Sequence, residues 1–242
     1  MKTSMICKGC WSQLHVPVVI RGPLAIPFRA LGLGISRMHP NLCTLCETQF
    51  AKAKKAKQIT VRVSVLFADV RGYTTLSEVL ENPAIARLLS SFYERCASVI
   101  WERDGLINKL IGDAMLALFN FPLVREDHVR QAVQSGVELQ RACAGIKASL
   151  GLSGQELAIG VGVGIHTGDV LLGEVGEFCR DFTAVGSVVN LASRLQGAAE
   201  AGEVLVTEEV YREVADLFPA AEARSYHLKG VEHPVSAYSL RA

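Results

Sequence analysis

Apolar side chains occupy every second position from Val61 to Phe67, and this alternation predicts a β-strand that ends at Asp69. Helical periodicity begins at about Tyr73 and continues, past a break at Pro83, to about Arg103. The same periodicities next predict a hairpin over 106–119 with its tip at 112–113, a helix over about 126–150, and a hairpin over 157–175 that turns at 167–169. After these they predict a helix over about 188–200, a strand over 204–206 and a short helix from 208. Strands near 224–228 and 234–240 end the predicted order. This mixed order predicts an α+β fold of the ferredoxin-like type, a mainly antiparallel sheet with helices packed on it.

Charge is distributed unevenly along the chain. Its 242 residues carry 25 basic and 24 acidic side chains, a formal net charge of +1, and 50% of them are hydrophobic. This composition excludes a disordered chain and a small disulfide-stapled domain. Residues 1–57, however, hold nine of the basic side chains and a single acid, so this segment carries +8 and the remainder −7. We therefore treat the two segments separately, and expect the basic one to regulate the acidic one within the same assembly.

Two Cys-x-x-Cys turns lie in the basic segment, at Cys7 and Cys10 and at Cys43 and Cys46. Such turns can direct four thiolates at one point, as in a structural zinc site, so residues 1–50 are predicted to form a small zinc-ribbon-like module. The gap between the pairs is longer than in a compact zinc ribbon and is rich in proline and glycine, which predicts loops pinned at their bases. A thiol redox site, an iron–sulfur site and unligated thiols are the alternatives.

Residues 51–58 are rich in alanine and lysine, which predicts a solvated helix that connects the module to a domain over 59–242. Aromatic residues do not alternate with these lysines, so nucleic-acid binding is not expected. The best apolar candidate for a membrane span, residues 14–35, is interrupted by two arginines and three prolines. Because a signal-peptide pattern is also missing, we expect a cytoplasmic protein with no membrane span.

Two predicted turns contain a carboxylate. Asp69 ends a strand, and Gly72, Tyr73 and Thr74 then lead into a helix whose first N–H groups can bind phosphate. A carboxylate beside such a helix start can hold a divalent cation that bridges to the phosphate. Asp113 lies at the tip of the next hairpin, and adjacent central strands would bring the two carboxylates together. Taken singly, the two residues also fit a helix cap and an ordinary turn aspartate.

Asn190 and Arg194 share one face of the helix predicted over 188–200, because they are four residues apart. An amide and a guanidinium on one polar face can bind negative charge that develops on a phosphate group. For this pair taken alone, a solvated helix surface is the alternative.

Five motifs together resemble, in order and spacing, the catalytic domain of class III nucleotidyl cyclases. They are Val-Leu-Phe-Ala-Asp-Val-Arg-Gly-Tyr-Thr at 65–74, Asn-Lys-Leu-Ile-Gly-Asp at 108–113, Gly-Ile-His-Thr-Gly at 164–168, Val-Gly-Ser-Val-Val-Asn-Leu-Ala-Ser-Arg at 185–194 and Leu-Lys-Gly at 228–230. The resemblance covers residues 59–242 and implies the class III cyclase fold. It also implies a head-to-tail homodimer in which each active site is shared between two protomers.

The resemblance implies that Asp69 and Asp113 of one protomer hold two Mg²⁺ or Mn²⁺ ions, helped by the carbonyl of Val70. The implied reaction is an attack of the ribose 3′ oxygen on the α-phosphorus, which releases pyrophosphate and leaves a cyclic monophosphate.

The same resemblance assigns three residues to the rest of the nucleotide. The partner protomer would supply Asn190, which orients the ribose, and Arg194, which stabilises charge at the α-phosphate. Lys229, in the Leu-Lys-Gly motif, matches the family's lysine on the terminal phosphates.

Two positions bear on the choice of purine. Lys109 matches the adenine-selecting lysine of the family, where guanylyl cyclases typically carry glutamate, because an ammonium can donate to adenine N1 but cannot accept from the protonated N1 of guanine. Thr183 occupies the second position, and its hydroxyl can accept or donate. The expected activity is therefore conversion of ATP to 3′,5′-cyclic AMP in intracellular signalling.

Three other functions are compatible with parts of the pattern. A guanylate cyclase would keep the same metal site, and a silent homologue would bind nucleotide without turnover. A zinc-bearing nucleic-acid-binding protein would use the basic segment instead. The metal, ribose and phosphate residues are all intact, which favours an active cyclase. We expect the cysteine module to set the geometry of the dimer through the connecting helix.

Overall fold

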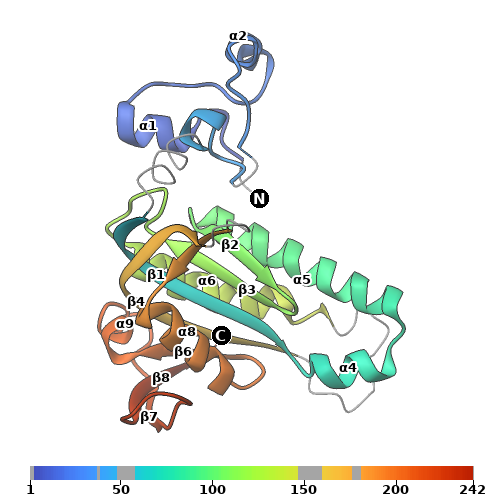
Figure 1. Ribbon diagram of the computed structural model, residues 1–242, viewed down its shortest axis with the longest axis vertical. Helices are drawn as coiled ribbons and strands as arrows, with labels where there is room; N and C mark the ends of the chain where they lie inside the picture. The colour runs from blue at the N-terminus through green and yellow to red at the C-terminus, as the bar shows by residue number, and fades with distance from the viewer. Residues whose placement is uncertain (1–2, 37–38, 48–57, 147–159, 176–180, 242) are drawn as a thin grey trace.

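The computed structural model describes residues 3–36, 39–47, 58–146, 160–175 and 181–241. Figure 1 shows a small N-terminal module next to a domain built on a single sheet. Of the predicted connecting helix over 51–58, only the last residue lies within the described residues, and it begins the first strand.

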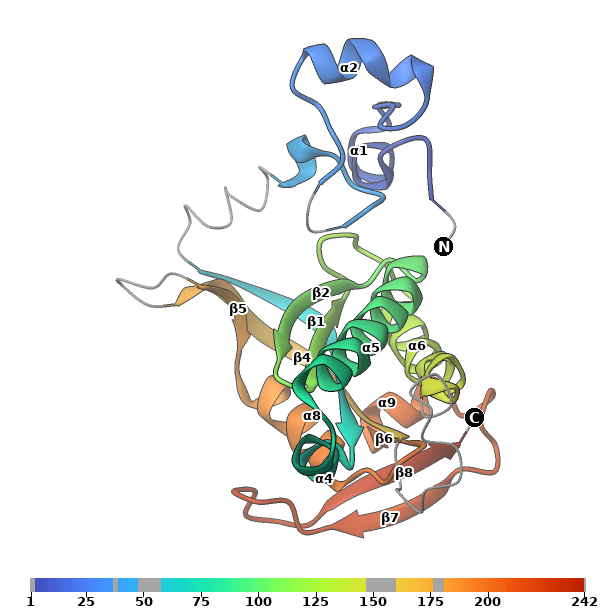
Figure 2. The ribbon, with the colours of Figure 1, turned by 90° about the vertical axis from the view of Figure 1, so that its right-hand side faces the viewer.

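Three short helices form much of the N-terminal module: α1 (Lys8–Leu14), the 3₁₀ helix η1 (Pro23–Ala25) and α2 (Ile26–Ala30). Helix α2 lies at the end of the module that is farthest from the sheet (Figures 1 and 2). The prediction that only loops join the two cysteine pairs is therefore wrong. A proline stands in the first turn of η1 and of α2, where its missing N–H costs no hydrogen bond, so these prolines begin helices.

Within the described residues, eight strands form one sheet in the order β2-β3-β1-β4-β6-β8-β7, and β5 pairs with β4 beside this path. They are β1 (Gln58–Arg71), β2 (Leu106–Ile111), β3 (Ala114–Phe119), β4 (Gly160–Val175), β5 (Asp181–Val185), β6 (Glu203–Thr207), β7 (Glu222–Tyr226) and β8 (Val235–Arg241). Neighbouring strands are antiparallel except β4 and β6, which run parallel. The α+β class with a mainly antiparallel sheet is thus confirmed.

Helices cover both faces of the sheet. They are α4 (Tyr73–Val79), α5 (Asn82–Glu102), α6 (His128–Cys143), α8 (Ser187–Ala198) and α9 (Glu208–Arg212). Side chains alternate along β1, so Leu66 and Ala68 pack in one core with α5 and α6, whereas Val65 and Phe67 pack in a second core with α8 (Figure 2). Asp69 continues the second set. Among the helices that the structure describes, none is both long enough and apolar enough to cross a membrane.

A single strand replaces the hairpin predicted over 157–175. Strand β4 runs through the described part of this segment without a turn and pairs with the whole length of β1. Gly168 suggested a turn, but its role is to let α8 approach, because a Cβ at this position would lie 2.7 Å from a Val188 methyl carbon. The hairpin partner of β4 is β5, a strand that the sequence pattern does not predict.

Candidate functional site

The strand register brings the two predicted metal carboxylates to one end of the sheet. Asp69 lies opposite Ala114 in the β1–β3 ladder, and the backbone N–H of Val70 donates to the carbonyl of Asp113 at 3.2 Å. The hairpin of β2 and β3 turns at Gly112 and Asp113 as predicted, with Gly112 at a positive φ of 61°. Asp69 at the end of β1 and Asp113 at the hairpin tip therefore lie close together, near enough for the charge of Asp113 to act on Asp69.

Electrostatics at this end of the sheet favour a cation. Burial and the negative charge of Asp113 raise the pKa of Asp69 from 3.8 to about 6, and Arg71 partly opposes this shift. A divalent ion would relieve the repulsion between the two carboxylates. The available donors are carboxylate and carbonyl oxygens, the ligands that Mg²⁺ and Mn²⁺ prefer, so the residues present fit these metals.

Two residues that the sequence pattern did not single out support the carboxylates. Arg71 lies 3.8 Å from Asp69 and donates to the Gln196 carbonyl of α8, so it joins the end of β1 to the helix. The hydroxyl of Tyr93, on α5, donates to the carbonyl of Gly112 and holds the hairpin tip. Arg71 lies inside a recognised motif, whereas nothing in the spacing of Tyr93 distinguishes it from an ordinary half-buried helix residue.

The predicted phosphate-binding residues follow directly on the carboxylate strand. Gly72 has a positive φ of 78°, which glycine tolerates best, and it turns the chain into α4. Tyr73 begins that helix, and both Gly72 and Thr74 are exposed. Lys229 is exposed in the connection between β7 and β8. The structure thus leaves these polar groups open to a ligand.

Helix α8 presents Asn190 and Arg194 away from its own sheet. The helix packs on β4 through Val188 and Ala192, and Asn190 and Arg194 each follow one of these buried residues by two positions. Two positions correspond to about 200° around a helix axis, so both polar side chains lie on the outer face. Both are exposed. They do not converge with Asp69 and Asp113 of the same chain.

The two predicted purine-selecting residues lie on β2 and β5, which do not pair in the sheet but are joined by one side-chain hydrogen bond. Lys109 of β2 pairs with Leu116, whose side chain belongs to the α8-side core, so Lys109 is on the same sheet face as Asp69. Thr183 is on β5, and the amide of Asn108 donates to the Phe182 carbonyl at 3.3 Å, which joins β2 to β5. Asn108 is the extra residue of a β-bulge in β2.

The four predicted zinc ligands converge in the N-terminal module. All four side chains are buried, and their sulfur atoms lie within 4.8 Å of one another. Sulfur–sulfur contacts in the cluster include 3.4 Å between Cys10 and Cys43 and 3.8 Å between Cys43 and Cys46. These values are close to the edge of about 3.8 Å that Zn–S bonds of about 2.3 Å give a tetrahedron. The N–H of Cys43 donates to the sulfur of Cys7 at 3.2 Å, a contact that stabilises a thiolate. This cluster fits a tetrahedral zinc ion.

Gly9→Ala tests this metal site, because a Cβ at position 9 would lie 2.7 Å from the sulfur of Cys46. Alanine suits a helix better than glycine, so we expect a loss specific to the cluster, with zinc affinity lowered about tenfold in competition with a chromophoric chelator. Gly34→Ala is the matched control, since a Cβ there would meet only a Thr44 methyl at 4.0 Å. Equal zinc affinity of the two variants would contradict a site at the cluster.

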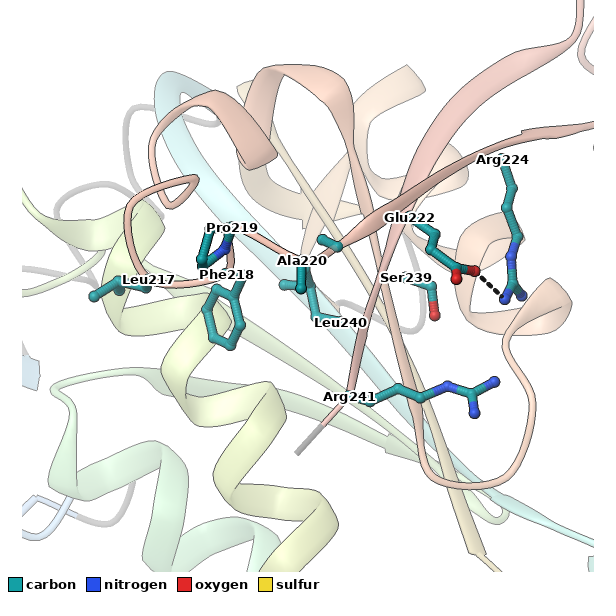
Figure 3. A pocket seen from close by; sticks show the side chains of 10 residues that line it. Leu217, Phe218, Pro219, Ala220, Glu222, Arg224, Ser239, Leu240 and Arg241 are labelled. Atoms are coloured by element: carbon teal, nitrogen blue, oxygen red, sulfur yellow. Dashed lines mark hydrogen bonds and ion pairs between the residues drawn. The ribbon is translucent and has the colours of Figure 1, made fainter.

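A cavity of about 450 Å³ lies elsewhere, along β7 and β8 (Figure 3). Leu217 and Phe218 line one end of it, and Glu222 and Arg224, joined by an ion pair of 3.0 Å, line the other. None of the predicted site residues borders this cavity. It is therefore separate from the carboxylates, Lys109 and the outer face of α8.

Comparison with known proteins places this arrangement in the class of nucleotidyl cyclases. The chain belongs to the family described as the adenylate and guanylate cyclase catalytic domain, which it matches over residues 55–242. The adenylate cyclase of Anabaena cylindrica is 33% identical over 192 residues, covering 76% of this chain and 37% of that protein. Adenylate cyclase 1 of Rhizobium meliloti is 30% identical over 136 residues, or 56% of this chain and 20% of its own length. The match thus spans between a fifth and little more than a third of the length of these relatives.

Solved structures of both nucleotide classes are similar to this chain. The adenylyl cyclase CyaB from P. aeruginosa has a TM-score of 0.68 at 30% identity, covering 75% of this chain and 94% of that one. The guanylyl cyclase Cya2 has a TM-score of 0.69 at 28% identity, covering 76% and 93%. The class III cyclase fold predicted from the motifs is confirmed. Because both kinds of cyclase are so similar to the chain, the choice of nucleotide has to be argued from its own residues.

Proposed function

We propose that the protein is an adenylate cyclase that converts ATP to 3′,5′-cyclic AMP and pyrophosphate at a site shared by two copies of the chain. The observation that carries this proposal is the division of the polar residues. Asp69 and Asp113 lie close together at the end of the sheet, whereas Asn190 and Arg194 point away from it on α8. A second, antiparallel copy would bring the outer face of one α8 to the carboxylates of the other.

The residues of one protomer would bind the phosphates and the metal ions. Two Mg²⁺ or Mn²⁺ ions held by Asp69, Asp113 and the carbonyl of Val70 supply charge neutralisation at the phosphates and lower the pKa of the ribose 3′ hydroxyl. The backbone N–H groups from Gly72 to Thr74 follow these ligands directly in the chain and can donate to phosphate oxygens.

The partner protomer would complete the site with three side chains. Its Asn190 donates to the ribose and so holds the 3′ oxygen in line with the α-phosphorus. Its Arg194 donates to the α-phosphate, where negative charge grows in the transition state, and its Lys229 contacts the terminal phosphates. Each of the three is exposed on the single chain and available for such contacts.

The preference for ATP rests on Lys109. Its ammonium is a donor without an acceptor, so it matches the unprotonated N1 of adenine and opposes the protonated N1 of guanine. Thr183 can adapt to either base through its hydroxyl. The link between Asn108 and the Phe182 carbonyl keeps the two strands that carry these residues together.

Product identification tests the proposal. Purified protein incubated with Mn²⁺ and ATP should yield 3′,5′-cyclic AMP and pyrophosphate in equal amounts, identified by chromatography and mass spectrometry, and should turn over GTP more slowly. Faster conversion of GTP would assign a guanylate cyclase. The absence of product from either nucleotide, with folded dimeric protein, would leave a silent homologue.

A further inference from the structure

The N-terminal module packs directly on the catalytic domain at the place where β2 begins. Leu106, the first residue of β2, and Leu123 are buried in one cluster with the four cysteines and with Ile20 and Leu42 of the module. The ring of His39, which is fully buried, meets the ring of Trp101 on α5 edge-on at 6.4 Å. The module therefore contacts the end of α5 and the start of β2.

A buried carboxylate lies at the centre of this contact. Asp104 is in the turn between α5 and β2, and its side chain is only 8% exposed. It forms ion pairs with Lys8 of the module and, at 2.9 Å, with Arg125 of its own domain. Its φ of 59° is left-handed, a conformation that costs a non-glycine residue free energy unless its surroundings hold it. The two cations supply that support.

The cysteine cluster fixes the position of Lys8. This residue stands inside the first Cys-x-x-Cys turn, between Cys7 and Gly9, and its backbone N–H donates to the Asn41 carbonyl at 2.9 Å. A metal ion bound by the sulfurs of Cys7 and Cys10 would hold both sides of the turn, and therefore the base of the Lys8 side chain. Without the ion the turn is free to reorganise, since the four sulfurs are not joined by disulfides.

Strand β2 is the element that such a clamp would control. Among the strands that the structure describes, it is the last on its side of the sheet and pairs in the ladder only with β3. Lys109 lies five positions after Asp104, and the hairpin tip with Asp113 follows. We propose that the four-cysteine module is a metal-dependent clamp in which zinc binding holds Lys8 on Asp104, and that Lys8 and Asp104 are positioning residues for β2.

Hydrogen exchange followed by mass spectrometry tests this clamp on the full chain. The importance of the clamp for Lys109 rests on the proposed function, whereas hydrogen exchange of β2 reports on the clamp alone. A failure of the clamp can therefore be distinguished from a failure of the proposed function. In the wild-type protein, removal of zinc by a zinc-selective chelator should speed exchange over residues 104–111 about tenfold, while β8 stays unchanged. Metal analysis before and after treatment confirms the removal.

Two variants identify the ion pair as the link. In zinc-bound Lys8→Met, the amide hydrogens of residues 104–111 should exchange as fast as they do in zinc-free wild type. Chelation of zinc should not speed this exchange further. Lys8→Arg keeps the charge and should restore the wild-type response. Lys8→Met should fold, because the Lys8 side chain is 37% exposed and Asp104 keeps its ion pair with Arg125. If it does not fold, the comparison of wild-type protein with and without zinc tests the clamp.

Four results would overturn the clamp. The first is that the purified protein contains no zinc, and the second is that residues 104–111 exchange at the same rate with and without zinc. The third is that chelation speeds exchange in Lys8→Met as much as in wild type. The fourth is that removal of zinc speeds exchange in β8 equally, which would mean that zinc supports the whole fold.

Discussion

Asp69→Asn is expected to lower cyclase turnover by about a thousandfold, equivalent to about 4 kcal/mol in the barrier. The amide keeps the shape of the side chain and loses the negative charge that attracts the cations. Burial and Asp113 raise the pKa of Asp69 to about 6, so its surroundings disfavour the ionised carboxylate when no cation is bound. Steady-state formation of cyclic AMP at saturating Mg²⁺ measures the effect.

Stability provides the control for this variant. The pKa of Asp69 in the fold lies above its ordinary value of 3.8, so ionisation of this group destabilises the folded state increasingly as pH rises from about 4 to about 6. At pH 7 without metal, Asp69→Asn should therefore melt at the wild-type temperature or above it. Asp216→Asn, which removes an exposed acid paired with Arg130, should retain full turnover. Comparable turnover in both variants would argue against a metal role for Asp69.

Arg194→Ala is expected to have the second-largest effect, a loss on the order of 3 kcal/mol, or about a hundredfold in turnover. Arg194 is exposed on the outer face of α8 and does not belong to the buried residues of that helix. The loss should therefore appear in turnover, with the melting temperature unchanged.

Arg212→Ala is the matched control for Arg194→Ala, because it removes another exposed arginine from a helix, one paired with Glu208. This variant should keep wild-type turnover. If Arg194→Ala also kept it, the role assigned to Arg194 would be refuted.

Local patterns predicted most of the catalytic domain because its elements follow simple periodicities. The alternation before Asp69 and the two-residue turn at Gly112 and Asp113 are determined by neighbouring residues, and both occur as predicted. Gly168 misled the prediction because its small size serves contact with Val188, which is 20 residues away and comes together with it only in the folded chain. Strand β5 is short and is stabilised by its pairing with β4, so its own sequence predicts a strand only weakly.

The candidate site shows the same division between local and distant causes. Motifs located Asp69, Asp113, Asn190 and Arg194, but no pattern predicted that Tyr93 of α5 would hold the hairpin tip. That contact depends on how a helix crosses the sheet, which is a matter of tertiary packing.

The basic N-terminal segment and the acidic domain form an ion pair with each other in the structure. The basic segment was expected to regulate the acidic domain through the connecting helix, which lies mostly outside the described residues. Instead, Lys8 of that segment contacts Asp104 of the domain directly. Part of the opposite charge of the two segments is thus paired within one chain, at the start of β2.

The central claim, that each active site uses residues of two protomers, is tested most directly by a heterodimer of Asp69→Asn and Arg194→Ala. The two chains are given different affinity tags, co-expressed, and purified through both tags in succession. One of the two sites then contains the intact Asp69 of one chain and the intact Arg194 of the other, so the heterodimer should show about half the turnover of the wild-type dimer. A heterodimer as inactive as either parent variant would contradict the shared site.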